Sequence, residues 1–503
     1  MNWTIYDTDQ IHRHGQTPEA VERQIENFIQ GFPYVNLVDA ATVENHGIQR
    51  FSAEQIQQLA NDFDARAPHL KVVLLAPASG AASRMFKSLF AFLNEQDDIQ
   101  DVDVQQFIEN IRQFAFYDDL KAACQKSGKD IEQASPKEIV ACLLEKEGLN
   151  YGNLPKGLLR FHRYADGCRL AVEEHLVEGA NYGKSADNKV FIHFTVSPEH
   201  QEYFVKALES VTEKYETAFG VDFEIGFSQQ KSSTDTIAVN LDNTPFRNAD
   251  GSLLFRPAGH GALIENLNDI NADIVFIKNI DNVVPDRLKP DTILHKKALG
   301  GLLIHITDDV KRLLNSLQQH PKQGIEEATD FIEKTLYLHL PAPFKSWSEP
   351  EKADFLKEFL ARPIRICGMV KNEGEPGGGP FFVGDAERNV SLQIVESSQI
   401  EMKNDQQATI AKGATHFNPV DLVCSVKDHD GNPFDLRRFV DPKTGFISEK
   451  SKDGKLLKAQ ELPGLWNGAM AKWITLFVEV PLITFNPVKT VNDLLRDEHR
   501  NLN

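Results

Sequence analysis

Residues 71–87 read KVVLLAPASGAASRMFK, and this stretch decides the fold class. Its first half is a short apolar run rich in branched side chains, which is typical of a β-strand buried on both faces. Its second half, residues 77–87, is a loop of small residues that leads into an apolar helical pattern. A buried strand followed by a tight turn and a helix is the repeating unit of an α/β fold.

Further runs of the same kind follow, with helical patterns between some of them. They are residues 189–197 (KVFIHFTVS), 222–228 (DFEIGFS), 272–280 (ADIVFIKNI), 364–370, 390–395, 420–426 and 473–480. This alternation predicts a Rossmann-like α/β core with a mainly parallel (mixed) sheet and helices on both faces. Ligands of such sheets bind beyond the carboxyl ends of the strands, so we expect the functional side chains there.

The domain prediction has two parts. Residues 1–70 carry polar amphipathic helical patterns and are predicted to be a helical N-terminal extension. Residues 71–503 contain no Pro- or Ser-rich linker and are predicted to be one α/β domain.

Composition narrows the function classes. The chain of 503 residues has 54 Lys and Arg against 73 Asp and Glu, a net charge of -19, which argues against a nucleic-acid partner. No apolar stretch reaches the length of a membrane span, and the N-terminus lacks the apolar region of a signal peptide. Five scattered cysteines without a CxxC pair are typical of reduced thiols. We therefore expect a cytoplasmic protein without a membrane or nucleic-acid partner.

The loop after the first strand has the composition of a phosphate site. Gly80, Ala81, Ala82 and Ser83 have small side chains, which let backbone N–H groups approach a phosphate closely. Arg84 adds a charged fork that suits phosphate oxygens. Tight packing between a strand and a helix would produce the same composition, so the motif alone leaves both readings open.

A second motif lies in residues 255–285, FRPAGHGALIENLNDINADIVFIKNIDNVVP. Gly259, His260 and Gly261 open a predicted helix that leads to an apolar strand ending in the residues NIDN. Asp281, at the end of that strand, is well placed to hold Mg²⁺, a hard cation that prefers oxygen ligands. Taken separately, NIDN also fits a polar turn and His260 a capped loop histidine.

Together these motifs resemble those of the UDP-sugar pyrophosphorylases, in the sugar-phosphate nucleotidyltransferase superfamily. Residues 80–85, GAASRM, are similar to the G-x-G-T-R-M signature, and residues 257–261 with the later D-N pair are similar to the nucleotide- and metal-binding segments. Residues 155–161, PKGLLRF, resemble the P-K-x-L-L-P-x segment whose lysine binds phosphate. The resemblance implies that Lys156 is a second phosphate-binding cation and that residues 87–153 are a largely helical insertion.

The same resemblance implies roles for further residues. Asp281 is the metal ligand, and residues 259–261 contact the base or ribose. At the end of the third strand, Gln229 or Gln230 lies near the base, with Lys231 at the same rim. The remaining implied residues are Lys489, in the phosphate-binding F-x-P-x-K element of residues 485–489, Glu373 and Glu375 for sugar hydroxyls, and Asn418 or Asp421 as a second metal ligand.

The implied activity is Mg²⁺-dependent nucleotidyl transfer from an NTP, with UTP favoured, to a sugar 1-phosphate, giving an NDP-sugar and pyrophosphate. Such a reaction needs cations and positioning but no nucleophilic side chain. Two alternatives stay open. One is a glycosyltransferase that consumes an NDP-sugar, whose metal-binding aspartate usually lies in a D-x-D rather than an NIDN motif. The other is a non-catalytic nucleotide-binding regulator.

Overall fold

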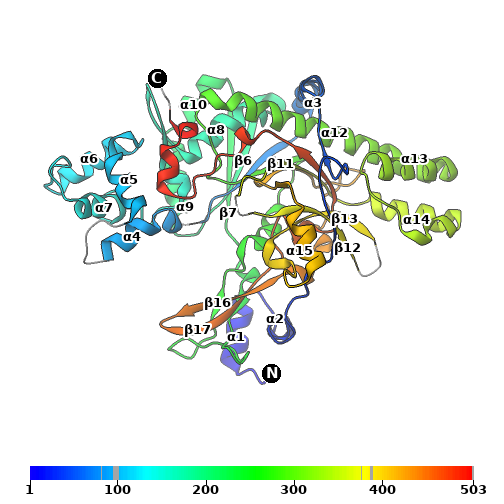
Figure 1. Ribbon diagram of the computed structural model, residues 1–503, viewed down its shortest axis with the longest axis horizontal. Coiled ribbons are helices and arrows are strands. Elements are labelled where there is room, and N and C mark those ends of the chain that lie inside the picture. Colours follow the sequence, from blue (N-terminus) through cyan, green and yellow to red (C-terminus); the bar gives the residue numbers. More distant parts are fainter. Residues whose placement is uncertain (81, 95–100, 375–376, 386–388, 501–503) are drawn as a thin grey trace. The chain divides into compact units, whose positions relative to one another are not determined.

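The computed structural model describes residues 1–80, 82–94, 101–374, 377–385 and 389–500 (Figure 1). The chain divides into two compact units, each built from three separate stretches. The first unit contains Met1–Gln55, Gln230–Val275 and Leu299–Val480, and the second contains Ile56–Gln229, Phe276–Ala298 and Pro481–Asn503.

Four strands of the central sheet lie wholly or partly in the second unit. Their order is β10-β3-β6-β7, and β3 pairs with β6, and β6 with β7, in parallel. These strands are β3 (Val72–Pro77), β6 (Lys189–Thr195), β7 (Asp222–Ser228) and β10 (Ile274–Lys278), the last of which contributes three residues here. The helices are α3 (Ala53–Arg66), α8 (Ala171–Tyr182), α9 (Gln201–Glu209) and α10 (Thr212–Phe219), and β4 (Arg160–Tyr164) and β5 (Gly167–Leu170) form a hairpin.

The predicted insertion between Arg84 and Lys156 is helical in its described residues. It contains α4 (Lys87–Asn94), α5 (Val102–Glu109), α6 (Tyr117–Lys126) and α7 (Pro136–Leu144). The apolar faces of these helices share one core, which includes the fully buried rings of Phe86, Phe107 and Phe116. Ser135 and Glu138 form a capping box at the start of α7, as expected for a helix that begins Ser-Pro.

The larger strands of the first unit pair in both directions. Their order is β2-β18-β11-β15, and β14 also pairs with β11. β11 pairs in parallel with β18 and antiparallel with β15. These strands are β2 (Ile48–Gln49), β11 (Ile364–Lys371), β14 (His416–Phe417), β15 (Asp421–Ser425) and β18 (Ile474–Glu479).

Smaller sheets and several helices complete the first unit. The small sheets are β1 (Leu37–Ala40), β12 (Gly379–Gly384) and β13 (Val390–Val395); β16 (Phe446–Lys452) with β17 (Lys455–Glu461); and β8 (Thr236–Ile237) with β9 (Phe255–Arg256). Its helices are α1 (Ile5–Arg13), α2 (Pro18–Gln30), α11 (Ile264–Asn268), α13 (Pro321–Lys334), α14 (Glu349–Leu360) and α15 (Asp405–Lys412). The long helix α12 (Lys289–Gln319) begins in the second unit and continues in the first.

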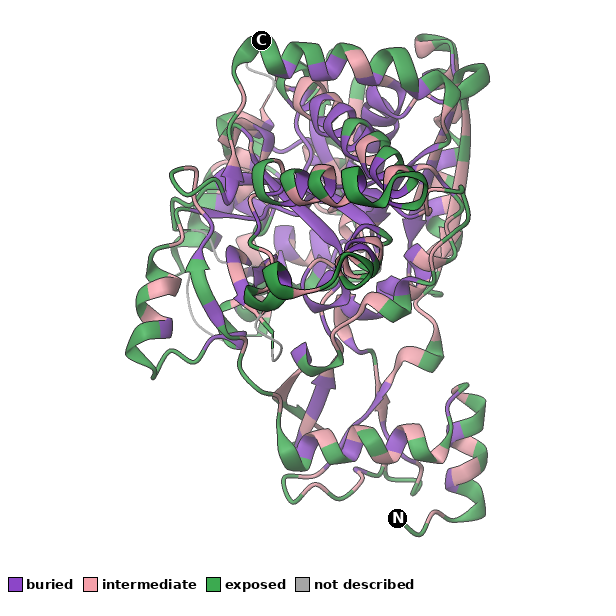
Figure 2. Cartoon of the chain, turned by 90° about the vertical axis from the view of Figure 1, so that its right-hand side faces the viewer, coloured by how far each residue is buried: buried purple, intermediate pink, exposed green. Residues whose placement is uncertain are grey.

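The α/β class and the mainly parallel sheet predicted from the sequence are confirmed. The apolar runs form strands within two residues of their expected bounds, because side chains buried on both faces define the strand interior. β3 and β10 are almost entirely buried, as expected, whereas β7, which lies at the end of the strand order, has no buried residue. Figure 2 shows that several helices expose one face to solvent. Residues 1–70 contain the expected helices and also β1 and β2. β1 is only four residues long and depends on its partner β12, a contact that the local sequence pattern does not contain.

Candidate functional site

The loop after β3 presents an exposed cation. Ser83 and Arg84 are exposed, and Arg84 has no ion-pair partner among residues whose structure is described. Ala82 differs from the expectation for a phosphate loop, because its methyl group is buried and its N–H donates to the Leu154 carbonyl at 3.1 Å. Gly80 has open space where a side chain would lie. Ala81 lies outside the described residues. The loop therefore presents the Arg84 guanidinium and has open space beside Gly80. Ala82 fixes the loop through its buried methyl group and its hydrogen bond to Leu154.

The structure brings together three residues that the sequence placed in separate motifs: Lys156, Asp281 and Lys489. The Lys156 ammonium lies 2.7 Å from Asp281 Oδ2 and donates to the Val488 carbonyl at 2.6 Å. Lys489 Nζ lies 3.5 Å from the same carboxylate oxygen. The Val488 N–H donates to the Asp281 carbonyl at 3.1 Å, so backbone and side chains hold this group together. We call these three residues the Asp281 cluster.

The Asp281 cluster is charged and open on one side. The side chains of Asp281 and Lys156 are 8% and 13% exposed, whereas that of Lys489 is 58% exposed. Burial opposes ionisation of Asp281, but attraction to Lys156 and Lys489 outweighs it and lowers the pKa of the carboxyl. Asp281 is therefore ionised at neutral pH, and two ammonium groups against one carboxylate leave net positive charge where Lys489 meets solvent.

Helix α8 holds the strand that leads to Asp281. Both carboxylate oxygens of Glu178 lie 2.8 Å from Lys278 Nζ, and His175 Nε2 donates to the Ile280 carbonyl at 3.2 Å. Lys278 ends β10 and Ile280 precedes Asp281. Burial lowers the pKa of His175 to about 4, so the ring stays neutral and keeps this hydrogen bond at physiological pH. The segment that carries Asp281 is thus held by side chains of the buried helix α8.

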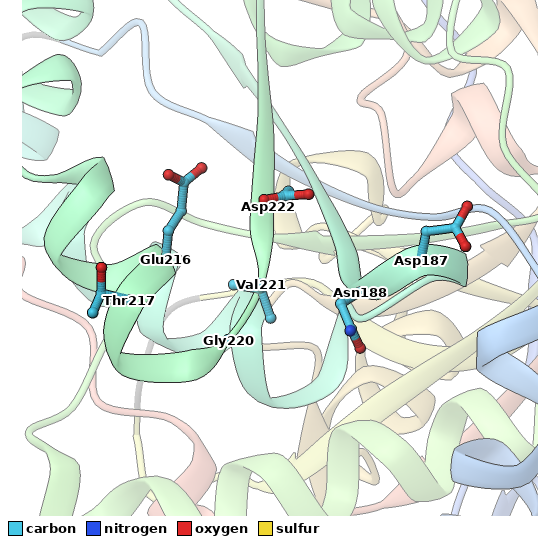
Figure 3. Close-up of a pocket in the computed structure, with 7 residues that line it drawn as sticks. All are labelled: Asp187, Asn188, Glu216, Thr217, Gly220, Val221 and Asp222. Carbon is cyan, nitrogen blue, oxygen red and sulfur yellow. The ribbon is translucent and has the colours of Figure 1, made fainter.

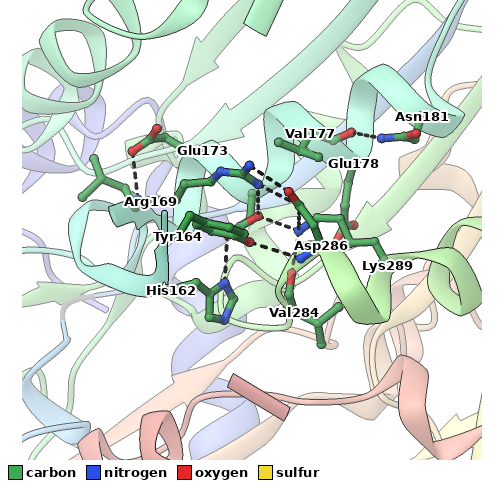
Figure 4. Close-up of polar contacts among 12 residues, drawn as sticks. His162, Tyr164, Arg169, Glu173, Val177, Glu178, Asn181, Val284, Asp286 and Lys289 are labelled. Atoms are coloured by element: carbon green, nitrogen blue, oxygen red, sulfur yellow. Dashed lines mark hydrogen bonds and ion pairs between the residues drawn. The ribbon is translucent and has the colours of Figure 1, made fainter. Parts of the chain in front are cut away.

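A second network on α8 surrounds Glu174, and Figure 4 shows its neighbourhood. Glu174 is fully buried and accepts from Lys289 at 2.5 Å, His162 at 2.9 Å, Tyr164 at 2.8 Å and Arg169 at 3.3 Å. Burial opposes ionisation of Glu174, yet attraction to Lys289, His162 and Arg169 outweighs it and lowers its pKa. Both carboxylate oxygens are satisfied by protein groups, which is the arrangement expected of a structural network.

The helical insertion also supports the Asp281 cluster. Val488, which precedes Lys489, is fully buried in the same core as the insertion helices, together with Val283 beyond Asp281. The Val491 N–H donates to the Met85 carbonyl at 3.1 Å, and Asn492 Nδ2 donates to the Asp103 carbonyl at 2.8 Å. The insertion therefore packs against the segment that carries Lys489.

In the first unit, His260 lies in a dense polar and aromatic group. Its Nδ1 accepts the Leu465 N–H at 3.0 Å, and its ring stacks on Trp466 with centroids 4.1 Å apart and planes at 14°. Its Nε2 lies 3.8 Å from Glu396 Oε1, which also accepts from Asn467 Nδ2 at 2.7 Å. We call His260, Glu396, Trp466 and Asn467 the His260 group.

Glycines allow this packing. A Cβ at Gly261 would lie 2.2 Å from the Pro463 carbonyl oxygen, and one at Gly464 would lie 2.5 Å from His260 Cε1. Gly259 has φ +75°, a conformation that other residues rarely adopt. Close approach of residues 462–463 thus explains Gly261, and its positive φ explains Gly259.

Sequence reasoning missed Glu396, Trp466 and Asn467. Trp466 and Asn467 lie in LPGLWNGAM, residues 462–470, a distinctive segment that suggested no chemistry by itself. Glu396 directly follows β13 and had no motif. All three are more than 130 residues from His260 in sequence, so only the fold reveals that they contact it.

The three residues after β7, at positions 229–231, fall into different units. Gln229 ends the first stretch of the second unit, and its Nε2 donates to Gln201 at 2.9 Å. Gln230 and Lys231 begin the next stretch of the first unit. Lys231 pairs with Glu265 and Asp269 at 3.3 and 2.7 Å, which ties it to α11, whereas Gln230 Nε2 is buried without a hydrogen-bond partner among the residues described. Gln230 is thus the amide with an available donor.

The remaining predicted residues lie in the first unit. Glu373 is exposed, and Glu375 lies outside the described residues. Asp421 is buried in β15 against Gly368 of β11, where a Cβ would lie 3.1 Å from its Oδ2. Asn418 donates to the Gly368 carbonyl at 3.1 Å, and its Oδ1 accepts the Val420 N–H at 3.0 Å. Asn418 therefore uses both ends of its amide to shape the loop.

Asp281 is the metal ligand that the sequence predicts at this cluster. Within the described ranges, no group of three or more His, Cys, Asp or Glu side chains is arranged to hold a metal ion. Both lysines contact Asp281 Oδ2, and Oδ1 has no hydrogen bond or ion pair with any described residue. Mg²⁺ commonly takes only one or two protein carboxylates and is completed by water and substrate phosphates. Asp281 fits that limited role.

A pocket of about 390 Å³ in the second unit is a different feature (Figure 3). It lies where β6 and β7 begin, between residues 187–188 and 216–222. Asp187, Glu216 and Asp222 line it, and their negative charge is unsuited to phosphate. None of the residues singled out in the sequence lies there.

No helix among the described residues is long and apolar enough to cross a membrane. The fold and the two residue groups define a mixed α/β protein with a lysine–aspartate cluster at the end of a buried strand. The chain belongs to the family described as a domain of unknown function (DUF4301), whose sequence model matches residues 4–500. The comparison with curated proteins found no match.

Solved structures with a similar fold include two pyrophosphorylases. The UDP-glucose pyrophosphorylase of Leishmania major is 11% identical, with a TM-score of 0.46, over 98% of this chain and 79% of the other. The UDP-N-acetylglucosamine pyrophosphorylase of Trypanosoma brucei is 12% identical, with a TM-score of 0.49, over 98% of this chain and 82% of the other. Similarity at this level does not extend to activity.

Proposed function

We propose that the protein transfers the nucleotidyl group of an NTP to a sugar 1-phosphate and releases pyrophosphate, as a Mg²⁺-dependent nucleotidyltransferase. The Asp281 cluster is the observation that supports this most. Two lysines from distant segments meet one carboxylate three residues beyond the end of the buried strand β10, and α/β proteins bind ligands beyond strand ends. The half-exposed Lys489 and the exposed Arg84 then offer positive charge to phosphate groups.

The chemistry requires charge and positioning from the protein. An oxygen of the sugar phosphate attacks the α-phosphorus of the NTP, forming a new P–O bond as the bond to the β-phosphate oxygen breaks and pyrophosphate leaves. Arg84, Lys156 and Lys489 would neutralise the charge of the reacting phosphates. Asp281 holds both ammonium groups at one point, which limits the reorganisation that the reaction would otherwise require.

Mg²⁺ would be held by Asp281, through the oxygen that the lysines leave open, and when bound it would offset phosphate charge. Asp421, in the first unit, stays a separate prediction as a metal ligand.

For the nucleoside and sugar we propose residues of the first unit. Residues 259–261 would contact the base or ribose, and the stacked rings of His260 and Trp466 form a flat surface suited to such a ligand. Gln230 would supply an amide donor to the base. Glu396 and Asn467 are additional hydroxyl-binding candidates beside His260, alongside the predicted Glu373 and Glu375. UTP is the favoured nucleotide, because the motifs resemble those of UDP-sugar pyrophosphorylases.

We also propose a cytoplasmic location. The five cysteines are all unpaired and four of them are buried, as expected of a protein that folds without disulfides.

The proposal is tested by measuring pyrophosphate release from each of the four NTPs with Mg²⁺ and a panel of sugar 1-phosphates. We expect release that needs one NTP and one sugar phosphate and that is lost in Asp281→Asn. Asp166→Asn is the matched control, because it removes a carboxylate whose pair with Lys214 is exposed on the same unit. Nucleotide binding without release for any pair would contradict the proposal and favour a binding protein or a glycosyltransferase.

A further inference from the structure

Arg365 is an arginine in the middle of the first unit's sheet, and its side chain is fully buried. Its Nε donates to Thr475 Oγ1 at 2.9 Å, and Nη1 donates to the Trp466 carbonyl at 2.6 Å. No carboxylate of the described residues pairs with it, and Nη2 has no hydrogen-bond partner among them. A buried cation without a counter-charge destabilises a fold, so this residue calls for an explanation other than stability.

The contacts of Arg365 point to the His260 group. Each of residues 465–467 makes one contact within that group. The Leu465 N–H donates to His260, the Trp466 ring stacks on His260, and Asn467 donates to Glu396. The carbonyl that Arg365 holds belongs to the central residue of this tripeptide. Arg365 and Thr475 lie opposite each other on the paired strands β11 and β18. Arg365 therefore connects the rigid sheet to the segment that shapes the His260 group.

We infer that Arg365 is a positioning residue for nucleotide binding: it fixes residues 465–467 so that Trp466 stacks on His260 and Asn467 orients Glu396. This inference rests on the proposed function, because it takes the His260 group as the surface that receives the nucleoside. Arg365 does not touch the ligand. Its guanidinium acts through a carbonyl, a role that a lysine fills only partly because it lacks the planar fork that reaches two acceptors at once.

The experiment uses the full-length chain labelled with 5-fluorotryptophan. The sequence has four tryptophans, and Trp466→Phe identifies the Trp466 fluorine resonance. The resonance is recorded, and UTP is titrated, in Arg365→Met and Arg365→Lys. Arg362→Met is the matched control, because it removes a neighbouring arginine whose contacts are the Glu358 carbonyl and the Phe359 ring.

We expect Arg365→Met to shift the Trp466 resonance without ligand and to weaken UTP binding by about tenfold to a hundredfold, as small misplacements do. KM for UTP should rise in step while kcat changes less, since binding rather than the chemical step is affected. Arg365→Lys should lie between, and Arg362→Met should match the wild type. A folded Arg365→Met with an unchanged resonance and unchanged UTP affinity would overturn the inference.

One further variant and the wild type complete the test. If Arg365→Met does not fold, Thr475→Val, which removes one acceptor and keeps the arginine, decides by the same two readouts. If the wild type binds no NTP, the proposed function fails and the nucleotide role of Arg365 with it. A wild type that binds UTP, beside an Arg365→Met that binds equally well, contradicts the inference alone.

Discussion

Two carboxylates of the second unit each face several cations, yet their surroundings differ. Both carboxylate oxygens of Glu174 accept hydrogen bonds from protein groups, namely Lys289, His162, Tyr164 and Arg169. The Glu174 and Lys289 side chains are at most 3% exposed. Asp281 is also buried, but both its lysines share one oxygen and Lys489 is 58% exposed. A closed network stabilises the fold, whereas an open one keeps charge available for a ligand.

The difference matters because both groups rest on the same helix. Glu174, His175 and Glu178 lie on α8, where Glu174 fixes Lys289 beyond Asp281 while His175 and Glu178 fix Ile280 and Lys278 before it. The Glu174 network thus holds the helix rigid, and the Asp281 cluster depends on that rigidity. The comparison would fail if an Asp281 variant lost only stability or a Glu174 variant lost only activity.

The largest effect is expected from Asp281→Asn. Losing a preorganised charge at a phosphoryl-transfer site reduces the rate by about 10²–10³-fold or more. The melting temperature should fall less than in a variant of the closed Glu174 network, because the exposed Lys489 side chain can turn to solvent. Pyrophosphate release and thermal unfolding are measured on the same preparation. A variant that unfolds but, where folded, works normally would place Asp281 with the structural residues.

Glu174→Gln is expected to do the opposite. Removing one partner of a buried ionic network typically costs about 3–5 kcal/mol. Lys289 and Arg169 would lose their buried counter-charge and keep only Asp286, whose side chain is 47% exposed. Chemical denaturation should therefore show a large loss in the free energy of unfolding. The folded fraction should keep kcat/KM within about threefold of the wild type. Activity lost at full stability would mean that Glu174 belongs to the reaction.

A smaller effect is expected from Lys489→Met. Because its side chain is mostly exposed, we expect little change in melting temperature, but KM for the NTP should rise about tenfold through loss of a phosphate contact. Lys214→Met, an equally surface-exposed lysine paired with Asp166, is the control. Equal KM values in both variants would remove Lys489 from the phosphate site.

The smallest effect concerns pH. The pKa of Glu174 is lowered on folding from its ordinary value of 4.5, so its contribution to stability is complete above about pH 4.5 and is lost as pH falls through the folded pKa. The stability gap between wild type and Glu174→Gln should therefore be constant at neutral pH and shrink below pH 4.5. A gap that widens in acid would reverse the assigned sign.

Much of the fold was predictable because buried strands carry their own signal. KVVLLAP is apolar enough to identify the buried strand β3 without knowledge of its neighbours, whereas DFEIGFS forms the strand β7, which is not buried. The sequence also singled out Lys156, Asp281 and Lys489 separately, and the structure brings them together, although their roles in catalysis stay predictions. The stretch AVEEHLVEGANY illustrates the limit. Its charges suggest a solvated helix, yet α8 is almost entirely buried, because its partners come from residues 162 to 289.

The first unit shows the same limit at the candidate site. Glu396, Trp466 and Asn467 approach His260 only through the fold, and a buried Arg365 without a carboxylate has no sequence signature. Single motifs report the chemistry of one segment, whereas contacts between distant segments require the tertiary structure.

The most direct test of nucleotidyl transfer follows the α-phosphorus. With UTP labelled at the α-phosphate and an excess of sugar 1-phosphate, we predict that the label passes into an NDP-sugar while unlabelled pyrophosphate forms in equal amount. The Asp281→Asn variant should leave the label in UTP, and Asp166→Asn should match the wild type. Label recovered only as UMP or UDP, or remaining in UTP with every sugar phosphate, would contradict the account.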